Sequence, residues 1–443
     1  MLILMLAVVM LSSVLGAACR REIPVPIDPP VDPPIVTDPP DEPTGPVEPA
    51  PQPQGEPLRY ILRVRTLTLV DGDGTVLAKA RCTVPEIANE SGHSGIAAIN
   101  GQLAESQQAF LNWVAENAPE VAREDRSARK QDFSFHLYES WSDVQYNGNG
   151  IFSVLTDDYF YSGGAHPSNF MKAANFVVES GVRLRLAEVW GKNAGPTMSE
   201  VYAIIAQQIE GQRGTDSFGY YDDYQDFYRE FYDPDDFVIT PNGLTVFYQP
   251  YTISPYAAGI PQFNVPFEQF PDTAMALPAI EDREWERDLH WAAGALLERN
   301  YEVAFGMYFL GWLAMDTPGI IEFSPGSEHF YLVTDPRFPN LAALRNFLRS
   351  TYVHTQVDAL LAEERYVEKE GTLYGDFLKD GGMGYYLDWS DFRFYVSEMA
   401  GDTAEIAILL SGVHPGDYEP TTETKFATLV MVNRNWLLQR LVY

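Results

Sequence analysis

The segment DDYFYSGGAHPSN, residues 157–169, places a single histidine behind two glycines and two aspartates. Ser162 and His166, with Asp157 or Asp158, supply the residue types of a hydrolase triad, but no nucleophile elbow or Ser-x-x-Lys pattern surrounds them. A zinc site needs several ligands at short spacing, and the segment offers only one histidine. The glycines permit a tight turn with positive φ, which His166 can brace by donating to backbone carbonyls. We therefore predict a structural or recognition loop formed by Tyr161, Ser162, Gly163, Gly164, Ala165 and His166.

The other residue types that carry chemistry are scattered along the chain. The six remaining histidines stand singly, and paired aspartates are expected by chance in so acidic a sequence. Cys82 lies in a strand-like stretch and is expected to be buried and inert. The sequence therefore predicts no catalytic residue, no metal site and no cofactor.

The composition limits the classes of partner. Asp and Glu number 62 against 30 Lys and Arg, which gives a formal charge of −32. Such a chain repels nucleic-acid phosphates and anionic membrane surfaces, so we expect no nucleic acid among its ligands. A basic protein partner fits better. Hydrophobic residues at 46% and aromatic residues at 13% exclude global disorder and favour β-rich domains.

The N-terminus has the order of a secretory signal. Residues 1–18 are apolar and end in small residues directly before Cys19, and LGAAC resembles a bacterial lipobox. We predict a signal peptide over 1–18, a lipidated Cys19, and an extracytoplasmic protein that contacts the membrane only through this anchor. Arg20 and Arg21 follow the apolar run, so an uncleaved membrane anchor is an alternative, as is a wrongly assigned start.

Proline spacing and composition divide the remainder of the chain. Residues 19–57 are proline-rich and acidic, which is typical of an extended linker. Strand alternation, a long helix and a further strand series predict an α+β unit over 58–271. The composition shifts again near 272–285, and helices followed by strands predict a second α+β unit over 285–443.

Local patterns predict individual elements. Apolar spacing indicates a long helix within 93–125, and DGDG at 71–74 indicates a hairpin turn. Tyrosines and phenylalanines at helical spacing over 220–231 are interpreted as a core stripe, with a contact surface as the alternative. Residues 285–316 predict a helix pair interrupted by Gly294 and Gly306, and the chain ends in a predicted strand hairpin.

Two stretches taken together carry a family resemblance. YSGGAHP at 161–167 and FVITPNGLTVFYQPYTISPYAAGIPQFNVPF at 237–267 resemble the extracytoplasmic domain of RsiV-type lysozyme-sensing anti-sigma factors, which also accompanies PdaC-type peptidoglycan deacetylases. The resemblance covers about 58–270 and implies a non-catalytic α+β domain that binds lysozyme. Besides the loop at 161–166, it implies partner-binding or motif roles for Tyr251, Pro255, Tyr256 and Gly259.

We expect this protein to be neither an anti-sigma factor nor a deacetylase, although it resembles a domain found in both. Only Met1 precedes the apolar run, which leaves no room for a sigma-binding segment, and no carbohydrate-esterase motifs follow the domain. Residues 335–443, with a helix pair leading to a Gly-x-Leu-Tyr strand, are similar to the IseA-type inhibitors of D,L-endopeptidases.

The sequence therefore favours a surface lipoprotein that binds a basic cell-wall hydrolase, a lysozyme or an autolysin, and that inhibits or senses it. A passive envelope scaffold or adhesive lipoprotein is the alternative. A peptidoglycan-modifying enzyme, with His166 and Asp157 or Asp158 as its reactive groups, is a weaker one.

Overall fold

The protein is represented by a computed structural model. The described residues are 57–88, 93–190, 194–213, 219–229, 233, 235–269, 277, 280–309, 315–321, 329–376, 386–413 and 421–443. The chain divides into Met1–Pro43 and Thr44–Tyr443, and every described residue belongs to the second part. The predicted signal peptide, Cys19 and nearly all of the predicted linker lie outside the described residues. Within the described part, no helix is both long and apolar enough to span a membrane.

The N-terminal hairpin and the long helix form as predicted. Strands β1 (Tyr60–Val70) and β2 (Val76–Ile87) pair antiparallel around the DGDG turn, where Gly74 has φ +87°. Helix α2 (Ile96–Arg129) buries its apolar residues at helical spacing against β2. Because β2 and β3 (His136–Gly148) pair in parallel, α2 is the crossover that connects them.

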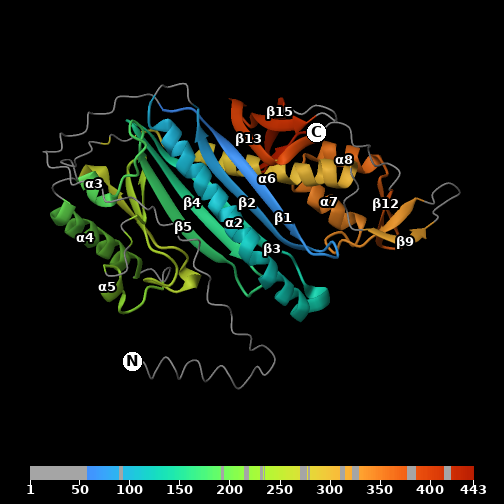
Figure 1. The fold of residues 1–443 in the computed structure, drawn as a ribbon, viewed down its shortest axis with the longest axis horizontal. Helices are drawn as coiled ribbons and strands as arrows, with labels where there is room; N and C mark the ends of the chain where they lie inside the picture. The colour runs from blue at the N-terminus through green and yellow to red at the C-terminus, as the bar shows by residue number, and fades with distance from the viewer. Residues whose placement is uncertain are drawn as a thin grey trace, which may run out of the picture. The chain divides into compact units, whose positions relative to one another are not determined.

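A nine-stranded sheet is the centre of the described fold (Figure 1), in the order β16-β15-β14-β13-β1-β2-β3-β4-β5. Both predicted units supply strands to this sheet. They join where β1, from the unit 58–271, pairs with β13, from the unit 285–443. The boundary expected between residues 271 and 285 therefore does not separate two sheets. The further strands are β4 (Ile151–Tyr161), β5 (Ser168–Val177), β13 (Tyr386–Ala400), β14 (Thr403–Val413), β15 (Thr421–Val432) and β16 (Asn435–Leu438).

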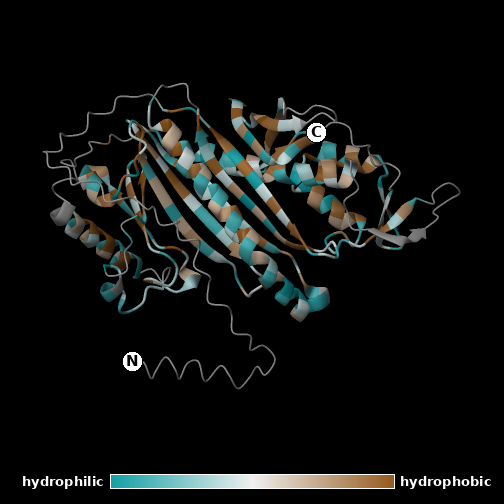
Figure 2. Cartoon of the chain, viewed as in Figure 1, coloured by the Kyte–Doolittle hydropathy of each residue, from teal (hydrophilic) through white to brown (hydrophobic). Residues whose placement is uncertain are grey.

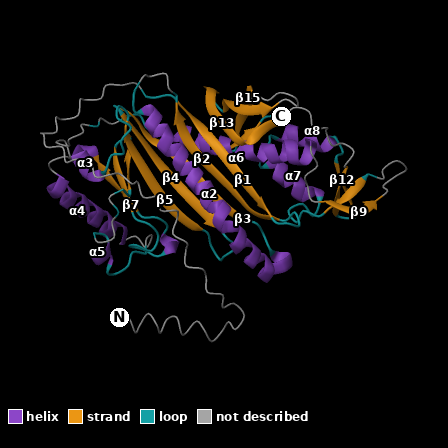
Figure 3. Ribbon diagram, viewed as in Figure 1, coloured by secondary structure: helices purple, strands orange, loops and turns teal. Residues whose placement is uncertain are grey.

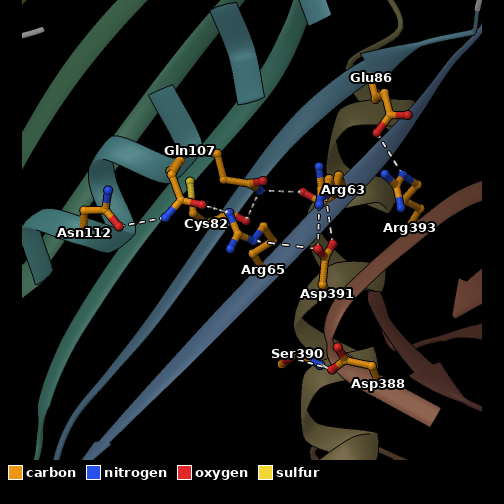
Figure 4. Close-up of polar contacts among 11 residues, drawn as sticks. Arg63, Arg65, Cys82, Glu86, Gln107, Asn112, Asp388, Ser390, Asp391 and Arg393 are labelled. Carbon is orange, nitrogen blue, oxygen red and sulfur yellow. Dashed lines mark hydrogen bonds and ion pairs between the residues drawn. The ribbon is translucent and has the colours of Figure 1, made fainter. Parts of the chain in front are cut away.

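An ionic cluster crosses the junction of β1, β2 and β13 (Figure 4). The guanidinium of Arg63 donates to the Asp391 carboxylate, with Nε to Oδ1 at 2.8 Å, and Arg393 Nε lies 2.8 Å from Glu86 Oε2. Burial alone would raise the pKa of Asp391, but the hydrogen bond from Arg63 and the charges of Arg63, Arg393 and Arg65 hold it below its ordinary value. The cluster adds charge-assisted bonds to a junction of only four paired residues on each strand.

Helix α6 (Glu284–Tyr301) packs on the sheet through side chains of β1, β3 and β13, and α2 packs on β2 with a separate set of core residues. Figure 2 shows hydrophobic residues alternating with hydrophilic ones along these elements. The predicted break at Gly294 is wrong, because the helix runs through it. A Cβ there would lie 2.8 Å from Cζ3 of Trp141, so the glycine permits close helix-to-sheet contact. A π-helical segment (Glu302–Phe309, η5) continues α6 through Gly306, so the predicted pair is one helical run.

A second, smaller sheet joins β6, β7 and β8 and packs against β5 (Figure 3). The aromatic residues at 220–231 were expected to form a core stripe. Three of them, Tyr220, Tyr224 and Tyr228, are buried in the hydrophobic core of this region. The elements of this region are α3 (Leu186–Trp190), α4 (Ala194–Arg213), α5 (Tyr224–Phe227), β6 (Phe237–Thr240), β7 (Gly243–Phe247), η3 (Tyr256–Ala258), β8 (Gln262–Pro266) and η4 (Phe267–Gln269).

The C-terminal region has the predicted helix pair and terminal hairpin. Asn340 caps the first helix by accepting a hydrogen bond from the Ala343 amide at 2.9 Å. Asn433 and Arg434, both at positive φ, form the turn of the hairpin. The elements are η1 (Lys130–Asp132) after α2, then β9 (Met315–Ile321), β10 (Phe330–Val333), α7 (Leu341–Arg349), α8 (His354–Ala362), β11 (Tyr366–Lys369) and β12 (Thr372–Asp376). The predicted α+β class is confirmed.

Candidate functional site

The predicted recognition loop connects β4 to β5 at one end of the large sheet. Gly163 has φ +81°, and a Cβ at this position would lie 2.7 Å from the Asp125 carboxylate at the C-terminal end of α2. Gly164, in contrast, has no unusual φ and has space for a side chain. The positive φ that the glycines permit is adopted by the first glycine of the pair, on which the turn depends.

The loop presents His166 to a second loop, which connects β7 to β8. The imidazole of His166 stacks on the ring of Tyr256 with centroids 4.0 Å apart and an angle of 22°, and Tyr251 stacks on Tyr256 at 6.1 Å and 29°. His166 Nδ1 donates to the Pro167 carbonyl at 2.8 Å, which is the predicted bracing bond. We call His166, Tyr256 and Tyr251 the aromatic stack.

Polar side chains fix the second loop to the edge strand β5. Gln249 Oε1 accepts from the Met171 amide at 3.2 Å, and Gln249 Nε2 donates to the Met171 carbonyl at 2.6 Å. Asn169 Nδ2 donates to the Tyr256 hydroxyl at 3.2 Å. The Gln249 side chain thus occupies backbone groups of β5 that an edge strand leaves unpaired. The bond from Asn169 holds the Tyr256 ring of the stack in position. Under the loop, burial and the nearby Asp233 raise the pKa of Asp236, which Gln249 contacts, to about 7.

Tyr251 is the exposed end of the aromatic stack. Its side chain is 57% exposed, and its backbone has φ +68°, a region that a bulky residue rarely adopts. Such backbone costs about 1–3 kcal/mol and concentrates at functional sites. Burial, followed by Tyr251 and the carboxylate of Asp223, raises the pKa of Tyr221 above its ordinary value.

The residues of the alternative triad are not brought together. Consecutive strand residues point to opposite faces, so Asp157 and Asp158 lie on different sides of the sheet. Asp158 is buried and its carboxylate lies 2.7 Å from Lys172 Nζ. Ser162 is exposed in the loop, and His166 makes its contacts with Pro167 and Tyr256 instead.

The remaining predicted site residues surround the stack. Ala165 is exposed, Pro255 directly precedes the turn of η3 that carries Tyr256, and Gly259 ends that turn with φ +75°. Cys82 is buried as expected, and burial raises the pKa of its thiol to about 12. Across the described ranges, no three His, Cys, Asp or Glu side chains group as metal ligands would.

Several contributors to the site were not predicted. Gln249 and Asn169 lie in or beside the two motif segments, but nothing in their spacing distinguishes them from other polar loop residues. The pairing of Gln249 with Met171 requires knowledge that β5 is an edge strand, which local sequence does not contain.

Comparison with protein families places both loops inside matched segments. Residues 73–169 match the family described as Deacetylase PdaC, and residues 192–268 match the family described as Protein of unknown function (DUF3298). No curated protein matches the sequence. The resemblance predicted for 58–270 is thereby confirmed at the level of these two domains. The finer likeness to lysozyme-sensing anti-sigma factors, and that of 335–443 to IseA-type inhibitors, stay predictions.

Two crystal structures are similar to part of the chain. A DUF3298 family member from Bacteroides fragilis is 13% identical, with a TM-score of 0.39, and the match covers 50% of this chain and 95% of that one. A DUF3298 family protein from Pseudomonas aeruginosa is 15% identical, with a TM-score of 0.35, over 49% of this chain and 94% of that one. The aromatic stack joins His166, in the segment that matches the PdaC family, to Tyr251 and Tyr256, in the segment that matches DUF3298.

Proposed function

We propose that the protein binds a basic cell-wall hydrolase, such as a lysozyme or an autolysin, through the aromatic stack, without catalysing a reaction itself. The observation that carries this proposal is the stack, which unites the two motif loops and ends in the exposed ring of Tyr251. Rigid aromatic side chains fixed by neighbouring bonds are frequent centres of protein interfaces.

Charge supports a basic partner. The formal charge of −32 attracts a cationic protein and accelerates its encounter at low ionic strength. The PdaC-like and DUF3298 domains fit an extracytoplasmic protein, and the resemblance to RsiV-type domains points to lysozyme. The likeness of residues 335–443 to IseA-type inhibitors makes a D,L-endopeptidase the second candidate partner.

The test is binding of the purified protein to an immobilised basic lysozyme. Tyr251→Ala is expected to weaken binding by about 10-fold or more, because removal of an aromatic interface centre costs about 2 kcal/mol or more. Phe426→Ala is the matched control, since Phe426 is an exposed aromatic residue on β15, outside both motif loops. The association rate is expected to fall steeply as salt is added.

Three results would contradict the proposal. Absence of binding to any basic hydrolase would favour the passive scaffold. Equal affinity of the Tyr251→Ala and Phe426→Ala variants for lysozyme would show that the stack is not part of the interface. New muropeptides in cell walls incubated with the protein would show that it is an enzyme.

We also propose that Cys19 carries the lipid anchor, on the strength of the apolar run and the small residues before it. Replacement of Cys19 by alanine is expected to move the protein from the membrane fraction to the soluble fraction. Retention of this variant in the membrane would favour the uncleaved apolar segment as the anchor.

A further inference from the structure

A cavity of about 840 Å³ opens where β1 begins, between the β3–β4 turn, the first turns of α6, and β13. Asn149 lines it at one end of β4, whereas the aromatic stack lies beyond Tyr161 at the other end. An 11-residue strand separates the two places by about 30 Å. The cavity is therefore distinct from the candidate site, and its volume is within the range that holds a small organic ligand.

Two polar side chains face this cavity without partners. His290 is 6% exposed and lines the cavity, and neither ring nitrogen has a hydrogen-bond partner among the described residues. Its ring packs against Tyr60 at 5.8 Å and Phe394 at 6.3 Å. The Tyr60 hydroxyl, also at the cavity, likewise has no hydrogen bond to the described part of the chain. Polar groups that line a cavity and have no protein partner are available to hydrogen-bond a ligand.

Burial sets the protonation of both groups. It lowers the pKa of His290 to about 4, so the imidazole is neutral at physiological pH and offers one donor and one acceptor. Burial, followed by the charges of Glu286 and Asp143, raises the pKa of Tyr60 well above its ordinary value, so its hydroxyl stays protonated. Both side chains are thus suited to bind hydroxyl or amide groups rather than a charge.

The charge of the cavity lining differs from that of the whole chain, because arginines outnumber acidic residues there. Three arginines and two glutamates line it, in a chain whose formal charge is −32. Arg283 is 51% exposed, and its ion pairs are loose, at 3.6 Å to Glu286 and 3.8 Å to Glu281. Arg287 pairs with Asp282 at 2.9 Å and keeps further donors for a planar anion.

We propose that this cavity binds a small hydroxylated organic anion, with its carboxylate or phosphate at Arg283 and Arg287 and its hydroxyl groups at His290 and Tyr60. The anionic group fits the guanidinium donors, and the hydroxyl groups supply hydrogen bonds to His290 and Tyr60, which have none to the described part of the chain.

Calorimetric titration of the full-length protein tests this proposal, with glucuronate, glucose 6-phosphate and citrate as probes and glucose as the neutral control. The anions are expected to bind at least about tenfold more tightly than glucose. Arg283→Gln is expected to weaken anion binding at least about tenfold. His290→Phe, which keeps a ring against Tyr60 and Phe394, is expected to do the same.

Arg345→Gln is the matched control, because Arg345 is a partly exposed, ion-paired arginine on α7 that does not line the cavity. Unfolding temperatures of all variants show that they fold. If none of the three anions binds to the wild-type protein at about 10 mM, the proposal is overturned. It is equally overturned if the Arg283→Gln, His290→Phe and Arg345→Gln proteins bind the anions alike. Lysozyme binding is measured separately, so failure here leaves the proposed function of the aromatic stack intact.

Discussion

Replacement of Gly294 by alanine is expected to lower the free energy of unfolding by about 1–3 kcal/mol, although alanine is the better helix former. The added Cβ would lie 2.8 Å from Trp141 Cζ3 and 3.0 Å from Cη2. The indole cannot easily move away, because it is buried and its Nε1 donates to Asp143 Oδ1 at 2.7 Å. The contact must therefore be relieved by separating α6 from the sheet.

The control for this prediction is Gly101→Ala in α2. Gly101 is exposed, and a Cβ there has no atom within 4 Å. The change is expected to stabilise the protein by up to about 1 kcal/mol, through helix propensity alone. Urea unfolding of the two variants thus gives effects of opposite sign. A stabilised Gly294→Ala protein would show that α6 does not approach Trp141 so closely.

Replacement of Gly163 by alanine is the second change with a large expected effect, about 1–3 kcal/mol of unfolding free energy. The residue has φ +81°, and its Cβ would lie 2.7 Å from Asp125 Oδ2. Asp125 is itself held by Arg129 Nε, at 2.7 Å from Oδ1, so the carboxylate cannot withdraw without losing this bond. Displacement of the loop would also move His166 off Tyr256.

The neighbouring glycine supplies the comparison. Gly164→Ala is expected to change stability by less than about 0.5 kcal/mol, since its backbone is not left-handed and its nearest atom lies 3.7 Å away. Denaturant midpoints measure both changes, and lysozyme affinity reports on the stack. If the two alanine variants are equally stable, the turn does not have the proposed backbone.

Much of the local structure could be predicted from the sequence. Period-3.6 spacing located α2, and the DGDG and Asn-Arg-Asn segments located two turns, because these signals act over a few residues. The break at Gly294 was wrong, since a glycine that weakens an isolated helix is here required by Trp141, about 150 residues earlier in the chain. Periodicity also cannot show that β1 pairs with β13, because strand order depends on contacts between distant segments.

The candidate site was predicted in part. The glycine turn and the bracing bond of His166 follow from the properties of those residue types, and both motif loops were identified. The stacking of His166 on Tyr256 was not predictable, because it depends on how β6 and β7 pack against β5. The cavity at His290 was missed for a similar reason. A lone histidine in a helix gives no local signal that distinguishes a cavity wall from a packed core.

The pairing of β1 with β13 has a consequence for how the chain acquires its structure. Arg63 and Asp391 are 328 positions apart, so the centre of the large sheet cannot close until β13 has been synthesised. Until then β1 has an open edge, to which another unfinished chain can attach. A fragment ending near residue 271 would keep that edge permanently, although it contains both family matches. Fragments that contain β1 but lack β13 are therefore expected to aggregate.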